Sequence, residues 1–110
     1  MMKFGDILKS AEDEGKEKHV PVIEVEGTDT VRVIVGKEVL HPNTVEHHIE
    51  WIELFGIKDN DQVISIGRTT FEPTFADPNV AFKVNTGEFK AFCALEFCNI
   101  HGVWQNCLEL

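Results

Sequence analysis

Short segments rich in valine and isoleucine, separated by turn-forming residues, recur along most of this chain. β-branched and aromatic residues favour strands, whereas glycine, proline, asparagine and aspartate between such runs favour turns. The predicted strands are Val20–Glu26, Val31–Val35, Val45–Leu54, Gln62–Phe71, Val80–Val84, Phe89–Cys98 and Val103–Leu108. No segment keeps a helical periodicity and no internal repeat is found, which excludes a helical bundle. We therefore predict an all-β fold, an antiparallel β-sandwich of immunoglobulin-like type with about seven strands.

The length of 110 residues fits one domain, which we place at 1–110. A composition of 43% apolar and 26% charged residues is typical of a folded protein rather than a disordered one. Near the N-terminus, Gly5 and Gly15 limit the helical turn that Asp6 could cap, so we expect a short irregular or helical segment there. No apolar run approaches the ~20 residues that span a bilayer, and no signal peptide is recognisable. We expect a cytoplasmic protein without membrane contact.

The charge balance is strongly acidic. Ten Lys and Arg residues against 19 Asp and Glu residues give a formal net charge of −9. Such a surface repels phosphate backbones, which argues against binding to nucleic acid.

Three cysteines are present, Cys93, Cys98 and Cys107, and none of them forms a CxxC pair. This number and spacing argue against a disulfide framework and against a zinc ribbon. Cys93 is expected to alternate with the core face as a small buried hydrophobe, while Cys107 fits either the core or the surface. Trp51 and Trp104 are expected to pack in the core.

Two of the five histidines are adjacent, and strand alternation gives them different roles. In a strand that includes Val45, His47 shares a face with apolar neighbours, whereas His48 shares a face with Glu46 and Glu50. We therefore expect His47 to point inward and His48 outward. A buried imidazole bonded to the backbone is the alternative interpretation of His47.

A metal site is indicated by Cys98 and His101, which are separated by two residues next to a turn. A thiolate combined with imidazoles suits iron, copper or zinc. The remaining candidate donors are three histidines near turns or predicted strand ends, His19, His41 and His47. Five donors exceed the four of structural zinc, and blue copper would need an axial methionine, which Met1 and Met2 at the chain end do not provide. Four imidazoles and one thiolate would fit iron with an open sixth position.

Three separate motifs give this chain a family resemblance. Glu17-Lys18-His19-Val20-Pro21, His41-Pro42-Asn43-Thr44 with Glu46-His47-His48-Ile49, and Cys98-Asn99-Ile100-His101-Gly102 resemble the iron-centre motifs of superoxide reductases. This family includes neelaredoxin and desulfoferrodoxin, and the resemblance covers residues 17–108. It implies one non-haem iron per chain on an immunoglobulin-like sandwich, with His19, His41, His47 and His101 as equatorial ligands and Cys98 as the axial thiolate.

The resemblance also implies an activity, the one-electron reduction of superoxide to hydrogen peroxide. It assigns catalytic roles to Glu17, which would occupy the sixth position in the oxidised form, and to Lys18, which would attract the substrate. With no cysteine before Cys93, the chain resembles the neelaredoxin-like class with a single iron. The implied partners are a rubredoxin-like electron donor and further copies of the chain in a dimer or tetramer. An electron-transfer or iron-storage module and a structural zinc domain are the alternative functions.

Overall fold

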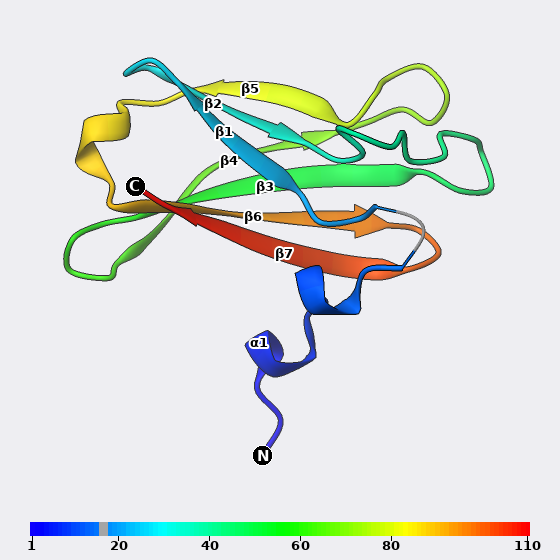
Figure 1. Ribbon diagram of the computed structural model, residues 1–110, viewed down its shortest axis with the longest axis horizontal. Coiled ribbons are helices and arrows are strands. Elements are labelled where there is room, and N and C mark those ends of the chain that lie inside the picture. Colours follow the sequence, from blue (N-terminus) through cyan, green and yellow to red (C-terminus); the bar gives the residue numbers. More distant parts are fainter. Residues whose placement is uncertain (16–17) are drawn as a thin grey trace.

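The computed structural model describes residues 1–15 and 18–110, and most of its regular structure consists of β-strands (Figure 1). A short helix α1 (Phe4–Ile7) and a 3-10 turn η1 (Ala11–Asp13) precede the strands. The strands are β1 (Val22–Glu26), β2 (Thr30–Ile34), β3 (Ile49–Ile57), β4 (Val63–Thr70), β5 (Asn79–Lys83), β6 (Ala91–Cys98) and β7 (Gly102–Glu109), with a second 3-10 turn η2 (Thr86–Glu88) between β5 and β6. The seven predicted strands and the short N-terminal helical segment are confirmed.

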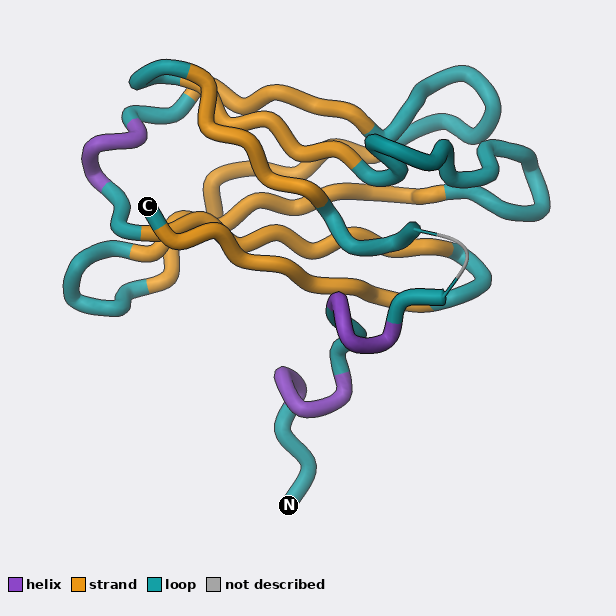
Figure 2. The backbone as a smooth tube through the Cα atoms, viewed as in Figure 1, coloured by secondary structure: helices purple, strands orange, loops and turns teal. Residues whose placement is uncertain are grey.

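The strands form two antiparallel sheets that lie face to face, as Figure 2 shows. One sheet has the order β1-β2-β5 and the other has the order β4-β3-β6-β7. Successive side chains of a strand point to opposite faces, so each strand sends every second residue between the sheets. The fully buried core side chains include Val31, Val33, Ile52, Leu54 and Phe92. The predicted antiparallel β-sandwich is thus confirmed.

Strand β3 begins at Ile49 rather than at Val45. Immediately before it, Thr44 and His47 exchange backbone hydrogen bonds of 2.9 and 3.2 Å, which close a tight turn. Val45 lies within this turn and is 68% exposed. The strand alternation expected from Val45 onward is therefore wrong, because the chain is not extended there.

Strand β6 turns its side chains the opposite way from the prediction. Phe92, Ala94 and Cys98 face the core, whereas Cys93 lies half-buried on the outer face of the sheet. There it stands directly opposite Cys107 of β7, and the two residues form a disulfide. The expectation of a core-facing Cys93 is therefore wrong. The β6–β7 register also pairs the two cysteines in one disulfide, although the number and spacing of cysteines argued against a disulfide framework.

The N-terminal segment leaves the sandwich along the edge of β7. The backbone N–H of Lys9 donates to the Val103 carbonyl at 3.3 Å, and the Gln105 N–H donates to the Lys9 carbonyl at 2.8 Å. The residues before Lys9 extend away from the two sheets (Figure 1), and the side chains of Phe4 and Ile7 are exposed. Among the described residues, no helix combines the length and hydropathy required to cross a bilayer.

Candidate metal centre

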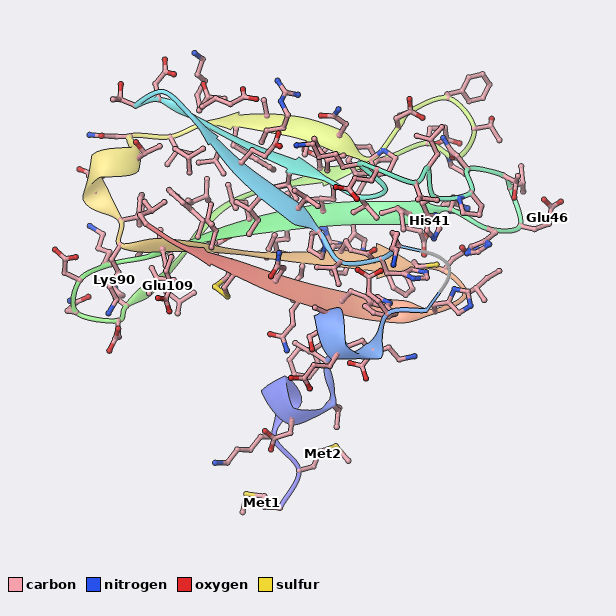
Figure 3. The ribbon with its side chains drawn as sticks, in the orientation of Figure 1. Met1, Met2, His41, Glu46, Lys90 and Glu109 are labelled. Atoms are coloured by element: carbon pink, nitrogen blue, oxygen red, sulfur yellow. A yellow bond between two sulfur atoms is a disulfide. The ribbon has the colours of Figure 1, made fainter. Side chains whose placement is uncertain are left out.

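Histidine and cysteine side chains from distant parts of the sequence meet at one end of the sandwich. Figure 3 shows His41 at this end, beyond the start of β3 and the end of β6. Four donor residues have ligand atoms within 4.8 Å of one another: His19, His47, Cys98 and His101. The antiparallel order explains this meeting, because the end of β6 lies beside the starts of β3 and β7.

His41 adjoins these four residues. Its Nε2 lies 3.7 Å from the Cys98 Sγ atom, and its ring contacts those of His19 and His47 at centroid distances of 4.8 and 4.7 Å. The Nδ1 of His41 lies 2.7 Å from the Pro42 carbonyl oxygen. A hydrogen bond donated by Nδ1 leaves Nε2 as the basic nitrogen that faces the sulfur. The five predicted donors are therefore brought together, four as one tight group and His41 next to them.

A glycine makes room for the loop that carries His41. Gly36 follows β2 and has a φ of +81°, a conformation that side chains with a Cβ rarely adopt. A Cβ built on Gly36 would lie 2.6 Å from the backbone nitrogen of His41. The close approach of the two backbones thus requires glycine here, a constraint that sequence reasoning missed.

Cys98 and His101 lie on the β6–β7 hairpin, as the two-residue spacing predicted. Cys98 is fully buried at the end of β6, and its Sγ lies 3.8 Å from the Nδ1 of His101 in the following turn. The same Nδ1 lies 3.1 Å from the Nε2 of His19. Gly102 closes the turn with a φ of +85°. The hairpin therefore presents one sulfur and one imidazole nitrogen to the same point.

His19 is fixed by two neighbours. Its backbone N–H donates to the Glu14 carboxylate at 3.1 Å, and its ring stacks on the indole of Trp104. Trp104 is buried, as expected, but it also contacts the donor cluster directly. Sequence reasoning missed Glu14 and favoured core packing for Trp104 over a role at the site. Trp51, also expected in the core, lies half-buried on the outer face beside Arg68.

The predicted orientation of His48 is wrong, although that of His47 holds. His48 is buried, and its Nδ1 lies 3.0 Å from the Thr44 carbonyl oxygen inside the turn before β3. Asn99 holds this turn against the β6–β7 hairpin. Its Oδ1 accepts from the His48 N–H at 2.9 Å, and its Nδ2 donates to the Glu46 carbonyl at 2.9 Å. Two segments about fifty residues apart therefore fix the position of His47.

A carboxyl group lies buried next to the cluster. Glu96 is fully buried on the core face of β6, between Ile52 of β3 and Trp104 of β7 in the register of the sheet. Neither carboxyl oxygen has a hydrogen-bond partner among the described residues. Burial, with a smaller contribution from the charge of Glu14, raises the pKa of Glu96 to about 9. Glu96 is therefore a neutral acid at pH 7, and it adds no charge beside the cluster.

Lys18, predicted to attract an anionic substrate, is exposed and directly precedes the donor His19. Its Nζ lies 3.4 Å from the Gly15 carbonyl oxygen. It lines a shallow hollow of about 390 Å³ together with Glu14, Lys37 and Glu38. Lys37, one of the lining residues, forms an ion pair with Glu24. Glu17, the other predicted catalytic residue, lies outside the described residues.

Comparison with known proteins agrees with this geometry. The model of the family described as desulfoferrodoxin matches residues 11–107 of the chain. The chain belongs to the desulfoferrodoxin family. The matched region includes every candidate donor described above.

Individual relatives of this family match over nearly the full length. A superoxide reductase of Pyrococcus abyssi is 45% identical over 112 residues, which cover 96% of each chain. The neelaredoxin of Megalodesulfovibrio gigas is 33% identical over 124 residues, covering 96% of this chain and 95% of that protein. The solved structure of the superoxide reductase (neelaredoxin) from Ignicoccus hospitalis superposes with a TM-score of 0.84 at 33% identity and covers 99% of this chain and 98% of that one.

The donor set fits the mononuclear metal that the desulfoferrodoxin family implies. Thiolate and imidazole together are ligands for iron, zinc and copper, whereas a magnesium or calcium site would require oxygen donors. Cys98, His19 and His41 are buried, while His47 and His101 are half-buried. The cluster therefore lies just beneath the surface, with His47 and His101 as its more exposed members.

Proposed function

We propose that this chain is a superoxide reductase, which reduces superoxide by one electron and, with two protons, yields hydrogen peroxide. The observation that carries this proposal is the buried cluster of one thiol and several imidazoles, in a chain that matches superoxide reductases over nearly its whole length. A purely structural zinc site would need only four donors, whereas five converge here.

The proposed ligands of one iron ion are the five converging side chains: His19, His41, His47, Cys98 and His101. When bound, ferrous iron supplies the single electron that superoxide accepts. The protein's own part is to hold the donors in place before the metal arrives. The Glu14 carboxylate, the Pro42 carbonyl and the Asn99 side chain perform this task through the hydrogen bonds described above.

Lys18 is proposed to draw the superoxide anion toward the half-buried side of the cluster. The chain as a whole carries a charge of −9, but charges beyond the Debye length of ~8 Å at physiological salt are largely screened. The charges that matter here are therefore local ones, namely the Lys18 ammonium, one residue before His19, and the Glu14 carboxylate, which accepts from the His19 N–H. Glu17 is proposed, from the family resemblance alone, as a carboxylate that would bind the iron in the oxidised protein.

The proposed electron donor is a rubredoxin-like protein, and the proposed location is the cytoplasm. We also propose that the chain forms a homo-oligomer, a dimer or tetramer. The exposed apolar side chains of the N-terminal segment support this, because Met1, Met2, Phe4 and Ile7 are uncovered in the single chain. Figure 3 shows Met1 and Met2 away from the two sheets. Light scattering on the full chain and on a variant without residues 1–8 tests this, and a monomer in both cases would contradict it.

Pulse-generated superoxide tests the proposed activity. The anaerobically reduced, iron-loaded protein should be oxidised by superoxide in a fast second-order reaction that yields peroxide and no dioxygen. Ferricyanide oxidation of the same sample is the control for a competent redox centre. If ferricyanide oxidises the site but superoxide does not, the protein is an electron carrier instead.

A further inference from the structure

The disulfide between Cys93 and Cys107 lies outside the site described above. It is on the outer face of the four-stranded sheet, toward the end of the sandwich that carries Lys90 and Glu109; Figure 3 shows these residues at the opposite end from His41. A hollow of about 480 Å³ adjoins it, and its lining includes Ile57, Asp61, Lys90, Cys93, Cys107 and Glu109. An incoming molecule therefore has room beside the disulfide.

We propose that Cys93 and Cys107 form a reversible thiol–disulfide exchange site whose co-reactant is a dithiol reductant. The two sulfurs differ in access, since Cys107 is exposed and Cys93 is half-buried. Attack by a thiolate requires access to the sulfur that it bonds to. Cys107 is therefore the sulfur that is attacked, and Cys93 is the leaving group.

The exchange balances as two successive steps. A thiolate of the reductant attacks the Cys107 Sγ, the bond between the two protein sulfurs breaks, and Cys93 leaves as a thiolate that takes up a proton. The second thiol of the reductant, as its thiolate, then attacks the reductant's own sulfur in the mixed disulfide and releases Cys107 as a thiol. The protein disulfide gains two electrons and two protons, and the reductant becomes a cyclic or intramolecular disulfide.

The sheet makes this exchange reversible. Backbone pairing between β6 and β7 continues on both sides of the cysteines, with Ala91 opposite Glu109 and Leu95 opposite Gln105. After reduction these backbone pairs still hold the two thiols opposite each other. The disulfide can therefore form again without a rearrangement of the fold. Both redox states therefore share one fold.

The charges around the hollow select among thiols. Lys90 forms an ion pair with Asp61, and Glu109 adds a further carboxylate to this lining. A negative charge near the attacked sulfur disfavours an anionic thiol and favours a neutral or cationic one. A dithiol without further negatively charged groups is therefore the preferred co-reactant.

The experiment treats the air-oxidised, full-length protein under native conditions with dithiothreitol, followed by acid quenching, alkylation and peptide mapping, which separates the pair from Cys98. Alkylation of Cys93 and Cys107 with an unchanged circular dichroism spectrum, reversed by oxidised dithiothreitol, is the expected result. Labelling of the pair only after denaturation would overturn the proposal and leave a closed structural crosslink. Free thiols at both positions in the air-oxidised protein would overturn it as well.

Matched single variants test which sulfur is attacked. The Cys93→Ser variant keeps the exposed Cys107, which should form a mixed disulfide with an added disulfide reagent several-fold faster than Cys93 does in the Cys107→Ser variant. Equal rates would overturn the assignment of Cys107. Cationic cysteamine should reduce the native disulfide several-fold faster than anionic mercaptoethanesulfonate. The Glu109→Gln substitution should lower the ratio of these two rates. An unchanged ratio would overturn the role of the charge.

Discussion

The indole of Trp104 lies parallel to the imidazole of His19, with ring centroids 4.6 Å apart and an angle of 11° between the planes. The same indole donates a hydrogen bond from Nε1 to the His101 carbonyl at 3.3 Å. One buried side chain thus supports the ring of one candidate ligand and the backbone of another. These ligands are 82 residues apart in the sequence.

Truncation of this indole should affect stability and metal binding together. Trp104→Ala removes a buried aromatic side chain, which costs roughly 3–5 kcal/mol of unfolding free energy. It also frees the His19 ring, so the affinity for iron should fall at least several-fold. Denaturant unfolding and metal titration measure the two effects. The control is Trp51→Ala on the half-buried outer face, where Trp51 packs against Arg68, and its metal affinity should remain that of the parent. Equal metal affinity in both variants would contradict the role of Trp104.

Gly36→Ala should displace His41. The added methyl group would lie 2.6 Å from the His41 backbone nitrogen, in addition to the cost of a positive φ. Gly27→Ala is the matched control, because Gly27 has a φ of +65° but a methyl group added there would meet no atom within 4 Å. We expect both variants to lose about 1 kcal/mol or more of stability, and only Gly36→Ala to bind iron more weakly. Weakened binding in the Gly27 variant as well would show that backbone strain alone is responsible.

Glu96 should make the stability of the metal-free protein fall with rising pH. Its pKa is about 9 in the folded chain and near the ordinary 4.5 when unfolded. Between these values only the folded chain keeps the proton, so the unfolding free energy falls by about 1.4 kcal/mol per pH unit. The unfolding free energy should become independent of this group below pH 4.5 and above about pH 9. In Glu96→Gln this slope should disappear, whereas the exposed Glu88→Gln should retain it. Denaturant titrations across this pH range measure the slope, and an identical slope in Glu96→Gln would rule out Glu96 as its origin.

Lys18→Ala should slow superoxide capture. The ammonium group contributes attraction at short range, so its removal should lower the second-order rate several-fold at low ionic strength and weaken the salt dependence. Lys83→Ala is the control, because Lys83 lies at the far end of β5, where it forms an ion pair with Asp29. Pulse radiolysis at several salt concentrations gives both rates. A Lys18→Ala rate equal to that of the Lys83 variant would remove Lys18 from substrate capture.

The strands could be predicted because each is a run of strand-forming residues between turn-forming ones. Which face of a strand points into the core could not always be predicted. Along β6, the alternate residues Cys93, Leu95 and Phe97 are apolar, while the opposite set includes Glu96. The apolar set therefore indicated the wrong core face of β6. The core face can hold Glu96 because its buried carboxyl is neutral, and the outer face carries apolar residues because it is half-buried. The disulfide had a detectable signal: pairing Cys98 with Gly102 across the turn places Cys93 opposite Cys107.

The candidate ligands were found by residue type and family resemblance, not by local structure. The inward direction of His47 followed from a strand that does not exist at Val45. The direction of His47 is set by the turn that Thr44 closes. Asn99, which is distant in the sequence, holds this turn in place. Contacts of this kind depend on the tertiary fold, and no local pattern in the segment from Val45 to His48 encodes them.

The metal content and visible spectrum of the anaerobically purified protein, before and after ferricyanide, test the central claim most directly. We predict one iron per chain and, on oxidation, a thiolate-to-iron absorption band that is absent from Cys98→Ser. Zinc in place of iron, or an oxidised spectrum that the Cys98→Ser substitution leaves unchanged, would contradict the assignment of the histidine and cysteine cluster as the iron site.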